Sequence, residues 1–193
     1  MNIIVVGPHG AGKTSVGQAL AKRLGVPFHA EIGRELAEDP QWRPAGHTAA
    51  DRQLAFDDEV MRRELARDAN WPAAQPRVVE TWHPGNLAYA LRRSPDRLAA
   101  WWPQLLAAAH RPTLALVLDA PDAVLRARQT EPGDGTFFST VGRQAPDCCR
   151  LLGIPIAGQF DGSAAFRQVL AAALDAVAPA CHPQPTLFYA TVE

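Results

Sequence analysis

Four residues near the start of the chain have the types and spacing needed to hold a nucleoside triphosphate. Gly7, Gly12, Lys13 and Thr14 fit the pattern G-x-x-x-x-G-K-[ST]. Glycines let backbone N–H groups turn toward phosphates, the lysine reaches the β- and γ-phosphates, and the threonine hydroxyl binds Mg²⁺. The pattern therefore predicts ATP and Mg²⁺ as cofactors. We expect the whole loop to contact the nucleotide: Gly7, His9, Gly10, Ala11, Gly12, Lys13, Thr14 and Ser15.

The segments on either side of this loop are those that phosphate binding requires. Residues 3–6 are a β-branched run typical of a strand buried on both faces of a parallel sheet. Residues 14–24 carry apolar side chains at helical spacing, and Gly25 ends that helix. The helix N-terminus would add partial positive charge beside the phosphates. This context favours a phosphate site over a glycine turn with an exposed lysine.

Two carboxylates end predicted strands and could act on the acceptor of a phosphoryl group. Glu31 follows a strand over 26–30, and Glu80 closes an apolar strand over 77–81. Transfer requires an acceptor hydroxyl held in line, a neutralised phosphate charge and exclusion of water. We expect Glu31 to hold the acceptor. The alternative is a helix N-terminal acid beside a solvated Arg34.

With Gly10, the loop takes the fuller form G-x-x-G-x-G-K-T. This form resembles the nucleoside, nucleotide and shikimate kinase branch of P-loop proteins. The resemblance implies a three-layer α/β/α fold with a five-stranded parallel sheet, a substrate beside the second and third strands, and an arginine-bearing lid. No guanine-reading N-K-x-D tetrapeptide is present, which argues against a GTPase, and the length and second motifs of AAA+ machines are absent.

The segment Glu31-Ile32-Gly33-Arg34-Glu35 resembles deoxynucleoside kinases and the nicotinamide riboside kinase branch. The resemblance implies that Glu31 is the catalytic base, that Arg34 contacts substrate or phosphate, and that Glu80 holds Mg²⁺ or substrate. Deoxynucleoside kinases follow the latter acid with Arg and Ser, whereas this chain continues Thr81-Trp82-His83. Trp82 could stack on a flat ring of the substrate, with core packing as the alternative.

Residues 126–131 partly resemble the R-x-R-x-x-E lid of deoxynucleoside kinases. The resemblance implies that Arg126 and Arg128 neutralise the transferring phosphate. The alternative is an exposed helix end whose cations favour its C-terminus. Because residues two apart lie on different faces of a helix, one of the two arginines could serve without the other.

Predicted strands alternate with predicted helices along the chain, which indicates a parallel sheet covered on both faces. We expect one kinase domain over residues 1–178, with the lid near 126–143, and a surface tail over 179–193. Residues 131–136 have the composition of a loop. The predicted strands are 3–6, 26–30, 77–81, 113–119 and 154–160, and the predicted helices include 14–24, 48–68, 98–109, 121–130 and one after 160.

The composition indicates a globular chain that works in a reducing compartment. The 193 residues are 47% hydrophobic and 20% charged, with a net charge of −1, so no general basic field attracts nucleic acid or membranes. Residues 3–6 are too short for a signal segment, and free thiols are the default for Cys148, Cys149 and Cys181. We therefore expect a cytoplasmic protein; whether it forms a homodimer is left open.

The leading hypothesis is an ATP- and Mg²⁺-dependent kinase that phosphorylates a hydroxyl of a small molecule, with a nucleoside-like acceptor favoured. One alternative is a nucleoside monophosphate kinase or a shikimate/gluconate-type kinase, which needs more cations near Arg34 for an anionic acceptor. Another is a kinase for an unusual metabolite. A fourth hypothesis is a non-kinase regulatory module that binds ATP.

Overall fold

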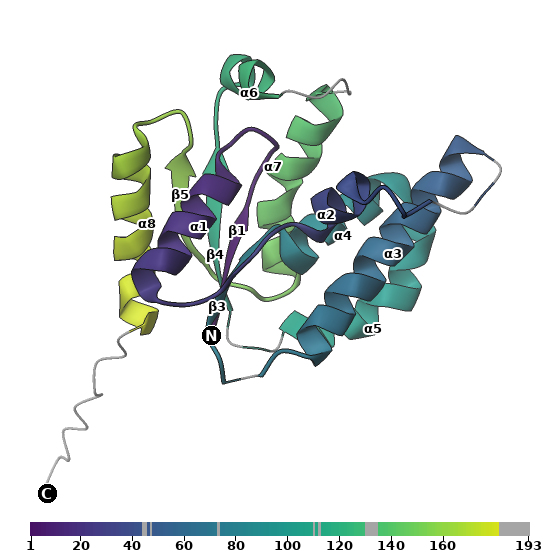
Figure 1. Cartoon of the computed structure of the whole chain (residues 1–193), viewed down its shortest axis with the longest axis horizontal. Coiled ribbons are helices and arrows are strands. Elements are labelled where there is room, and N and C mark those ends of the chain that lie inside the picture. The colour runs from purple at the N-terminus through teal and green to yellow at the C-terminus, as the bar shows by residue number, and fades with distance from the viewer. Residues whose placement is uncertain are drawn as a thin grey trace, which may run out of the picture.

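Five parallel strands form one sheet in the order β2-β3-β1-β4-β5 (Figure 1). The computed structural model describes residues 1–43, 46, 48–72, 74–109, 111, 113–129 and 135–181. The strands are β1 (Asn2–Val6), β2 (Phe28–His29), β3 (Arg77–Glu80), β4 (Thr113–Asp119) and β5 (Ile156–Asp161). The predicted five-stranded parallel sheet is confirmed.

The central position of β1 explains its apolar sequence. It pairs with β3 on one side and with β4 on the other, and all five of its residues are buried. Strand β2 is shorter than predicted and lies at the sheet edge, where it pairs with β3 alone. Because all strands are parallel, the ends of β1, β2 and β3 meet at one edge, which brings the phosphate loop, Glu31 and Glu80 together.

Helices cover both faces of the sheet. Helices α1 (Lys13–Leu24) and α8 (Phe166–Cys181) share one apolar core with the sheet, and α4 (Trp82–Arg93) and α7 (Gly135–Leu151) share the other (Figure 1). Beyond α4 lies a group of further helices that widens one side of the molecule. The remaining helices are α2 (Ile32–Glu38), α3 (Ala49–Ala69), the 3₁₀ turn η1 (Pro95–Arg97), α5 (Leu98–Ala109) and α6 (Asp122–Arg128).

Helix α7 is the main element that the sequence does not predict. It contributes Val141, Ala145, Cys148 and Cys149 to the core, and burial raises the pKa of each of the two thiols to about 12. Gly142 and a proline inside the helix conceal its pattern in the sequence. Part of the region expected to be a lid, residues 135–143, is therefore packed helix; residues 130–134, with the central lid segment, lie outside the described chain.

The predicted tail also begins differently. Helix α8 continues to Cys181, so residues 179–181 belong to it, and residues 182–193 lie outside the described part. Within the described residues, every helix is too short or too polar to cross a bilayer.

Candidate active site

The phosphate loop has the backbone conformation that its glycines make available. Gly7, Gly10 and Gly12 have φ of 139°, 83° and 93°. At Gly7 a Cβ would lie 1.9 Å from the Leu118 carbonyl oxygen, so only glycine fits there. Gly12 caps α1 with no side-chain hydrogen bond, which leaves the helix N-terminus directed at the loop. The loop therefore has the cradle shape that binds phosphate.

Lys13 is folded back against the loop that it is expected to serve. Its side chain is buried, at 4% exposure, and its Nζ donates to the Pro8 carbonyl oxygen at 3.2 Å. An ammonium with one backbone partner retains two donors for phosphate oxygens. This contact holds the charge at the centre of the loop.

Thr14, Glu80 and Arg34 meet in one polar cluster at the edge of the sheet. The Thr14 hydroxyl donates to the two Glu80 carboxylate oxygens, at 2.9 and 3.0 Å. Arg34 Nη1 lies 3.0 Å from the Thr14 hydroxyl oxygen, and its Nη2 lies 3.0 Å from Glu80 Oε1. Glu80 is fully buried, so Arg34 supplies the charge that compensates it.

Glu31 is a buried carboxylate surrounded by donors and cations. It directly precedes α2, accepts a hydrogen bond from the Thr81 hydroxyl at 3.1 Å, and lies 3.7 Å from Arg34 Nη2. Burial alone raises the pKa of Glu31, but the positive charges of Lys13, His9 and Arg34 with the Thr81 hydrogen bond outweigh it, so the net pKa is below the ordinary value. Glu31 is consequently ionised at neutral pH.

His9 connects the phosphate loop to the helices on the opposite wall. Its Nε2 lies 2.8 Å from the Tyr89 hydroxyl oxygen and 3.9 Å from Glu31 Oε1, and its ring stacks on Phe138 with centroids 4.8 Å apart. Burial has the largest effect on the pKa of His9 and lowers it. The charge of Glu31 raises this pKa, and nearby cations lower it further. Burial therefore disfavours a proton on His9, whereas the neighbouring Glu31 carboxylate favours one.

A cavity of about 720 Å³ opens between the phosphate loop, α2, α3 and α4. At the loop end its lining includes His9, Glu31 and Arg34. Beyond them it is lined mainly by aromatic and apolar side chains. One ion pair, between Asp57 and Arg93, interrupts this apolar lining. Asp57 accepts from Arg93 Nη1 at 3.2 Å, and the Arg93 guanidinium also lies over the rings of Tyr89 and Phe137.

The donor set around Thr14 fits a magnesium ion. Mg²⁺ prefers oxygen ligands and is usually bound by one or two carboxylates together with nucleotide phosphates. The Thr14 hydroxyl and the Glu80 carboxylate supply such oxygens in contact with each other. Among the described residues no cluster of three or more acidic, histidine or cysteine side chains could hold a metal by itself, so the ion would depend on the nucleotide.

One family model matches residues 2–136, and its description is AAA domain (AAA_28). The chain belongs to this family. The match covers the phosphate loop, Glu31, Glu80 and both lid arginines. The length and motifs of the chain led us to expect that it is not an AAA+ protein. The match to a model described as an AAA domain does not support that expectation.

The curated proteins that this chain resembles are shikimate kinases. A shikimate kinase of Symbiobacterium thermophilum is 46% identical over 66 residues, which is 34% of each chain. A shikimate kinase of Psychrobacter arcticus is 35% identical over 81 residues, covering 40% of this chain and 39% of the relative. The matched segments thus span well under half the length of these relatives. The predicted resemblance to P-loop small-molecule kinases is confirmed.

Solved structures of kinases share the fold over nearly the whole chain. A deoxyadenosine kinase from M. mycoides with bound dATP has a TM-score of 0.65 at 12% identity, covering 92% of this chain and 100% of that one. A gluconokinase from Sinorhizobium meliloti 1021 has a TM-score of 0.54 at 20% identity, covering 93% of each chain. These likenesses establish the three-layer α/β/α fold.

The structure brings most of the predicted site residues together, but not all of them. The loop residues, Glu31, Arg34 and Glu80 lie together as described above. Arg128 is near them: its Nη1 donates to the carbonyl oxygens of Gly10 and Gly162, at 3.2 and 2.8 Å. Arg126, by contrast, is exposed and does not line the cavity. Only one of the two lid arginines therefore reaches the phosphate loop.

Trp82 requires a correction. It is fully buried, it is absent from the cavity lining, and its indole N–H donates to Asp68 at 3.1–3.2 Å. The core-packing alternative describes its position, because the chain turns at the end of β3 so that the indole enters the core rather than the cleft. We do not count Trp82 among the residues that touch substrate.

Sequence reasoning missed the far wall of the cavity. Tyr89, Arg93 and Asp57 face the site from α3 and α4, and Phe137 and Phe138 face it from α7. A buried acid on the predicted helix 48–68 was the one available signal, since Asp57 interrupts its apolar side. The others depend on how the helices pack, which local patterns do not reveal.

Proposed function

We propose that the protein is an ATP- and Mg²⁺-dependent kinase that phosphorylates a hydroxyl group of a small, uncharged, ring-bearing molecule such as a nucleoside. The observation that carries the proposal is the position of Glu31. Its ionised carboxylate lies at the boundary between the phosphate loop and the cavity, where an acceptor hydroxyl would meet the γ-phosphate.

The chain's own residues divide the work of transfer. Glu31 would accept the proton of the acceptor hydroxyl as its oxygen bonds to the γ-phosphorus and the bond to ADP breaks. Lys13 and Arg128 lie where they would neutralise phosphate charge. Thr14 and Glu80 would hold Mg²⁺, which supplies charge neutralisation between the phosphates when bound. The aromatic walls would exclude water.

The charges of the cavity favour an uncharged acceptor. Arg34 is paired with Glu80 and Glu31, and Arg93 is paired with Asp57. On the acceptor side of the cavity, the described lining residues therefore offer no cation without a carboxylate partner. An anionic acceptor would have to displace one of these pairs, which leaves a buried carboxylate unpaired.

A shikimate- or gluconate-type kinase is the second candidate, because the curated relatives are shikimate kinases and a gluconokinase shares the fold. Both functions can be tested together by measuring ADP release with Mg·ATP and a panel of nucleosides, nucleoside monophosphates, shikimate and gluconate. We expect a nucleoside or a similar neutral compound to raise turnover above the water reaction. Stimulation by an acid alone would favour the second candidate, and stimulation by none would favour an ATP-binding regulatory module.

Glu31→Gln tests the catalytic assignment directly. The amide keeps the shape but cannot take a proton, so we expect kcat to fall by roughly 10²–10⁴-fold while ATP affinity changes little. Glu35→Gln, one helical turn along α2, is the matched control and should behave as the parent protein. An unchanged kcat in Glu31→Gln would remove this residue from the reaction. Lys13→Ala should weaken ATP binding and abolish transfer.

A further inference from the structure

Two residues that are not glycine adopt left-handed backbone conformations beside the candidate active site. Thr81 has φ 67° and Trp82 has φ 48°, and they connect Glu80 at the end of β3 to the first turn of α4. Such conformations are costly for β-branched and bulky residues and persist only where surrounding contacts enforce them. The contacts that enforce them can be identified.

Thr81 is held from three directions. Its N–H donates to the Val5 carbonyl oxygen at 2.9 Å, and its hydroxyl donates to Glu31. Its methyl group occupies the space beside Gly85, where a Cβ would lie 2.2 Å from Thr81 Cγ2. The turn therefore sets the position of Glu31 through the hydroxyl, as well as that of Glu80 through the chain.

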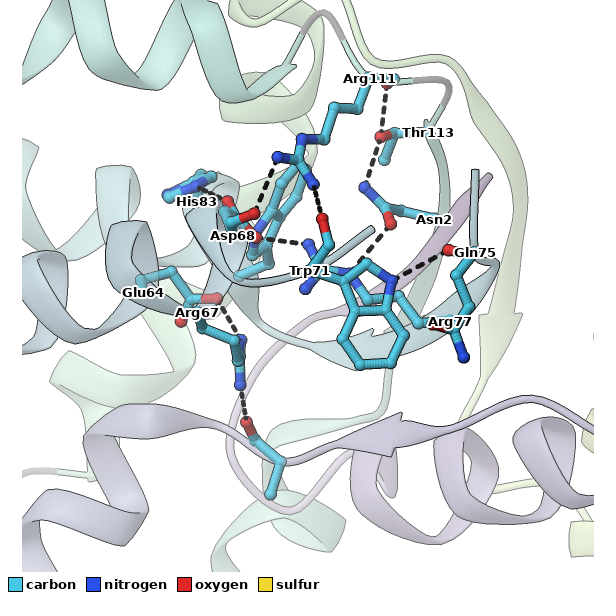
Figure 2. Close-up of polar contacts among 12 residues, drawn as sticks. Asn2, Glu64, Arg67, Asp68, Trp71, Gln75, Arg77, His83, Arg111 and Thr113 are labelled. Carbon is cyan, nitrogen blue, oxygen red and sulfur yellow. Dashed lines mark hydrogen bonds and ion pairs between the residues drawn. The ribbon is translucent and has the colours of Figure 1, made fainter. Parts of the chain in front are cut away.

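Trp82 and His83 are both anchored to a single buried carboxylate. Asp68, in the last turn of α3, accepts the Trp82 indole N–H, and its Oδ2 lies 2.7 Å from His83 Nε2. It also accepts from Arg77, at the start of β3 (Figure 2). The side chains of Trp82, His83 and Arg77 are all fully buried.

Further hydrogen bonds hold the backbone of Asp68 and its partner Arg77 in place. Arg111 donates to the Asp68 backbone carbonyl oxygen at 2.8 Å, and Arg77 donates to Asn2 at the start of β1 (Figure 2). None of these residues lines the active-site cavity. A polar network this deep is rarely maintained without a requirement for one definite geometry.

We propose that Asp68 is a positioning residue for phosphoryl transfer. By holding Trp82 and His83, it maintains the left-handed turn at Thr81–Trp82 and so fixes Glu80 beside Thr14 and the Thr81 hydroxyl beside Glu31. It touches neither nucleotide nor acceptor. The inference rests on the proposed kinase function for its catalytic consequence, but its structural consequence can be measured without an acceptor.

The first experiment compares the binding of ATP with and without Mg²⁺ by calorimetry. In Asp68→Asn, the amide N–H₂ cannot accept from the surrounding donors, so the turn loses the negative charge and one of the two acceptor atoms that hold it. We expect the gain in ATP affinity due to Mg²⁺ to fall by about 10–100-fold, as for other residues that orient metal ligands, while ATP affinity in EDTA is unchanged. If an acceptor is found, kcat should fall in parallel with little change in the KM for ATP.

A destabilised control separates positioning from loss of stability. Val177→Ala, in a fully buried position of α8 on the other face of the sheet, should lower the melting temperature and leave the Mg²⁺ effect intact. Equal Mg²⁺ effects in Asp68→Asn and Val177→Ala would overturn the proposal. If no acceptor supports turnover with the parent protein, the kinase function fails, yet the calorimetric comparison still decides the role of Asp68.

A second variant covers the case in which Asp68→Asn does not fold. Trp82→Phe keeps an aromatic ring in the core, deletes the indole N–H that Asp68 accepts and leaves the Asp68 carboxylate in place, at the cost of a smaller buried ring. It should show a smaller loss of the Mg²⁺ effect in the same direction, and faster amide hydrogen exchange at residues 80–83 than Val177→Ala. Parent-like exchange and a parent-like Mg²⁺ effect in Trp82→Phe would contradict the inference.

Discussion

At the scale of single residues, Thr81 adds to the charges of Lys13, His9 and Arg34 that lower the pKa of Glu31. The Thr81 hydroxyl donates to the ionised carboxylate, and a donor to the charged form lowers the pKa of an acid. Thr81→Ala removes this donor, so the pKa of Glu31 should rise. We predict that the acid limb of the kcat–pH profile moves to higher pH.

Thr81→Ser is the matched control, since it keeps the hydroxyl and removes only the methyl group. Its acid limb should coincide with that of the parent protein. Because the net pKa of Glu31 is below 4.5, the parent rate should be flat across neutral pH and decline only under acidic conditions. Identical limbs in the alanine and serine variants would show that Glu31 is not the group that titrates.

Some of these residues were predictable from the sequence and others were not. The loop was predictable because a strand, a glycine pattern and a helix follow one another directly, and the position of Glu31 was predictable because it follows another predicted strand. The left-handed turn at Thr81 was not, since positive φ is normally signalled by glycine or asparagine and neither occurs there. The position of Trp82 followed from that turn, so the sequence alone left stacking on the substrate and core packing as alternatives.

At the scale of elements, the contact between α7 and the phosphate loop is unusually close. A Cβ at Gly142 would lie 2.2 Å from Pro8 Cα, which is a backbone atom that cannot move aside without shifting the loop. Gly142→Ala should therefore raise the Kd for ATP, and it should do so even though alanine favours a helix by about 1 kcal/mol over glycine. Calorimetric titration with ATP measures the effect.

Gln144→Ala, two residues further along α7, tests whether the effect belongs to the loop contact. Gln144 contacts Arg92 and does not approach the loop, so its replacement should leave ATP binding unchanged. Comparable ATP affinity in the two variants would mean that the loop yields to the added methyl group. The close contact with Pro8 leaves little room for a side chain at position 142. The glycine found there weakens the helical pattern of α7 in the sequence.

The order of strands and helices was predictable, whereas the walls of the cavity were not. Alternating apolar runs and helical patterns gave the parallel sheet, because β1, β3 and most of β4 are buried on both faces. Which helices face the loop depends on packing between elements distant in sequence, such as Asp57 of α3 and Arg93 of α4. A sequence contains no local record of such pairs.

At the scale of the whole molecule, the Asp68 network ties α3 to the start of β3, to α4 and to Arg111 beside β4. Removing the carboxylate leaves the buried guanidinium of Arg77 without its acid. Breaking a buried ion pair in this way costs about 3–5 kcal/mol, a large part of the stability of an ordinary domain. Asp68→Asn should therefore lower the urea midpoint at neutral pH.

The loss of stability in Asp68→Asn should depend on pH, because it comes from the charge of the Asp68 carboxylate. Burial raises the pKa of Asp68, but His83 and Arg77 more than compensate, and the net pKa is below the ordinary 3.8. A depressed pKa contributes stability above the unfolded value, and that stability disappears as pH falls through the folded value. Urea midpoints of parent and Asp68→Asn should thus stay apart down to the unfolded value of 3.8 and converge only as pH falls below it.

Glu64, one helical turn earlier on α3, supplies a control of opposite sign. Burial raises the pKa of Glu64, and the charge of Arg67 only partly offsets this. A raised pKa means that its stabilising contribution is present below 4.5 and is lost as pH rises, so Glu64→Gln should gain stability relative to the parent protein as pH increases. Two acids on one helix would then change stability in opposite directions with pH. Parallel pH profiles for the two variants would instead show that the network responds to general loss of packing and not to the charge of Asp68.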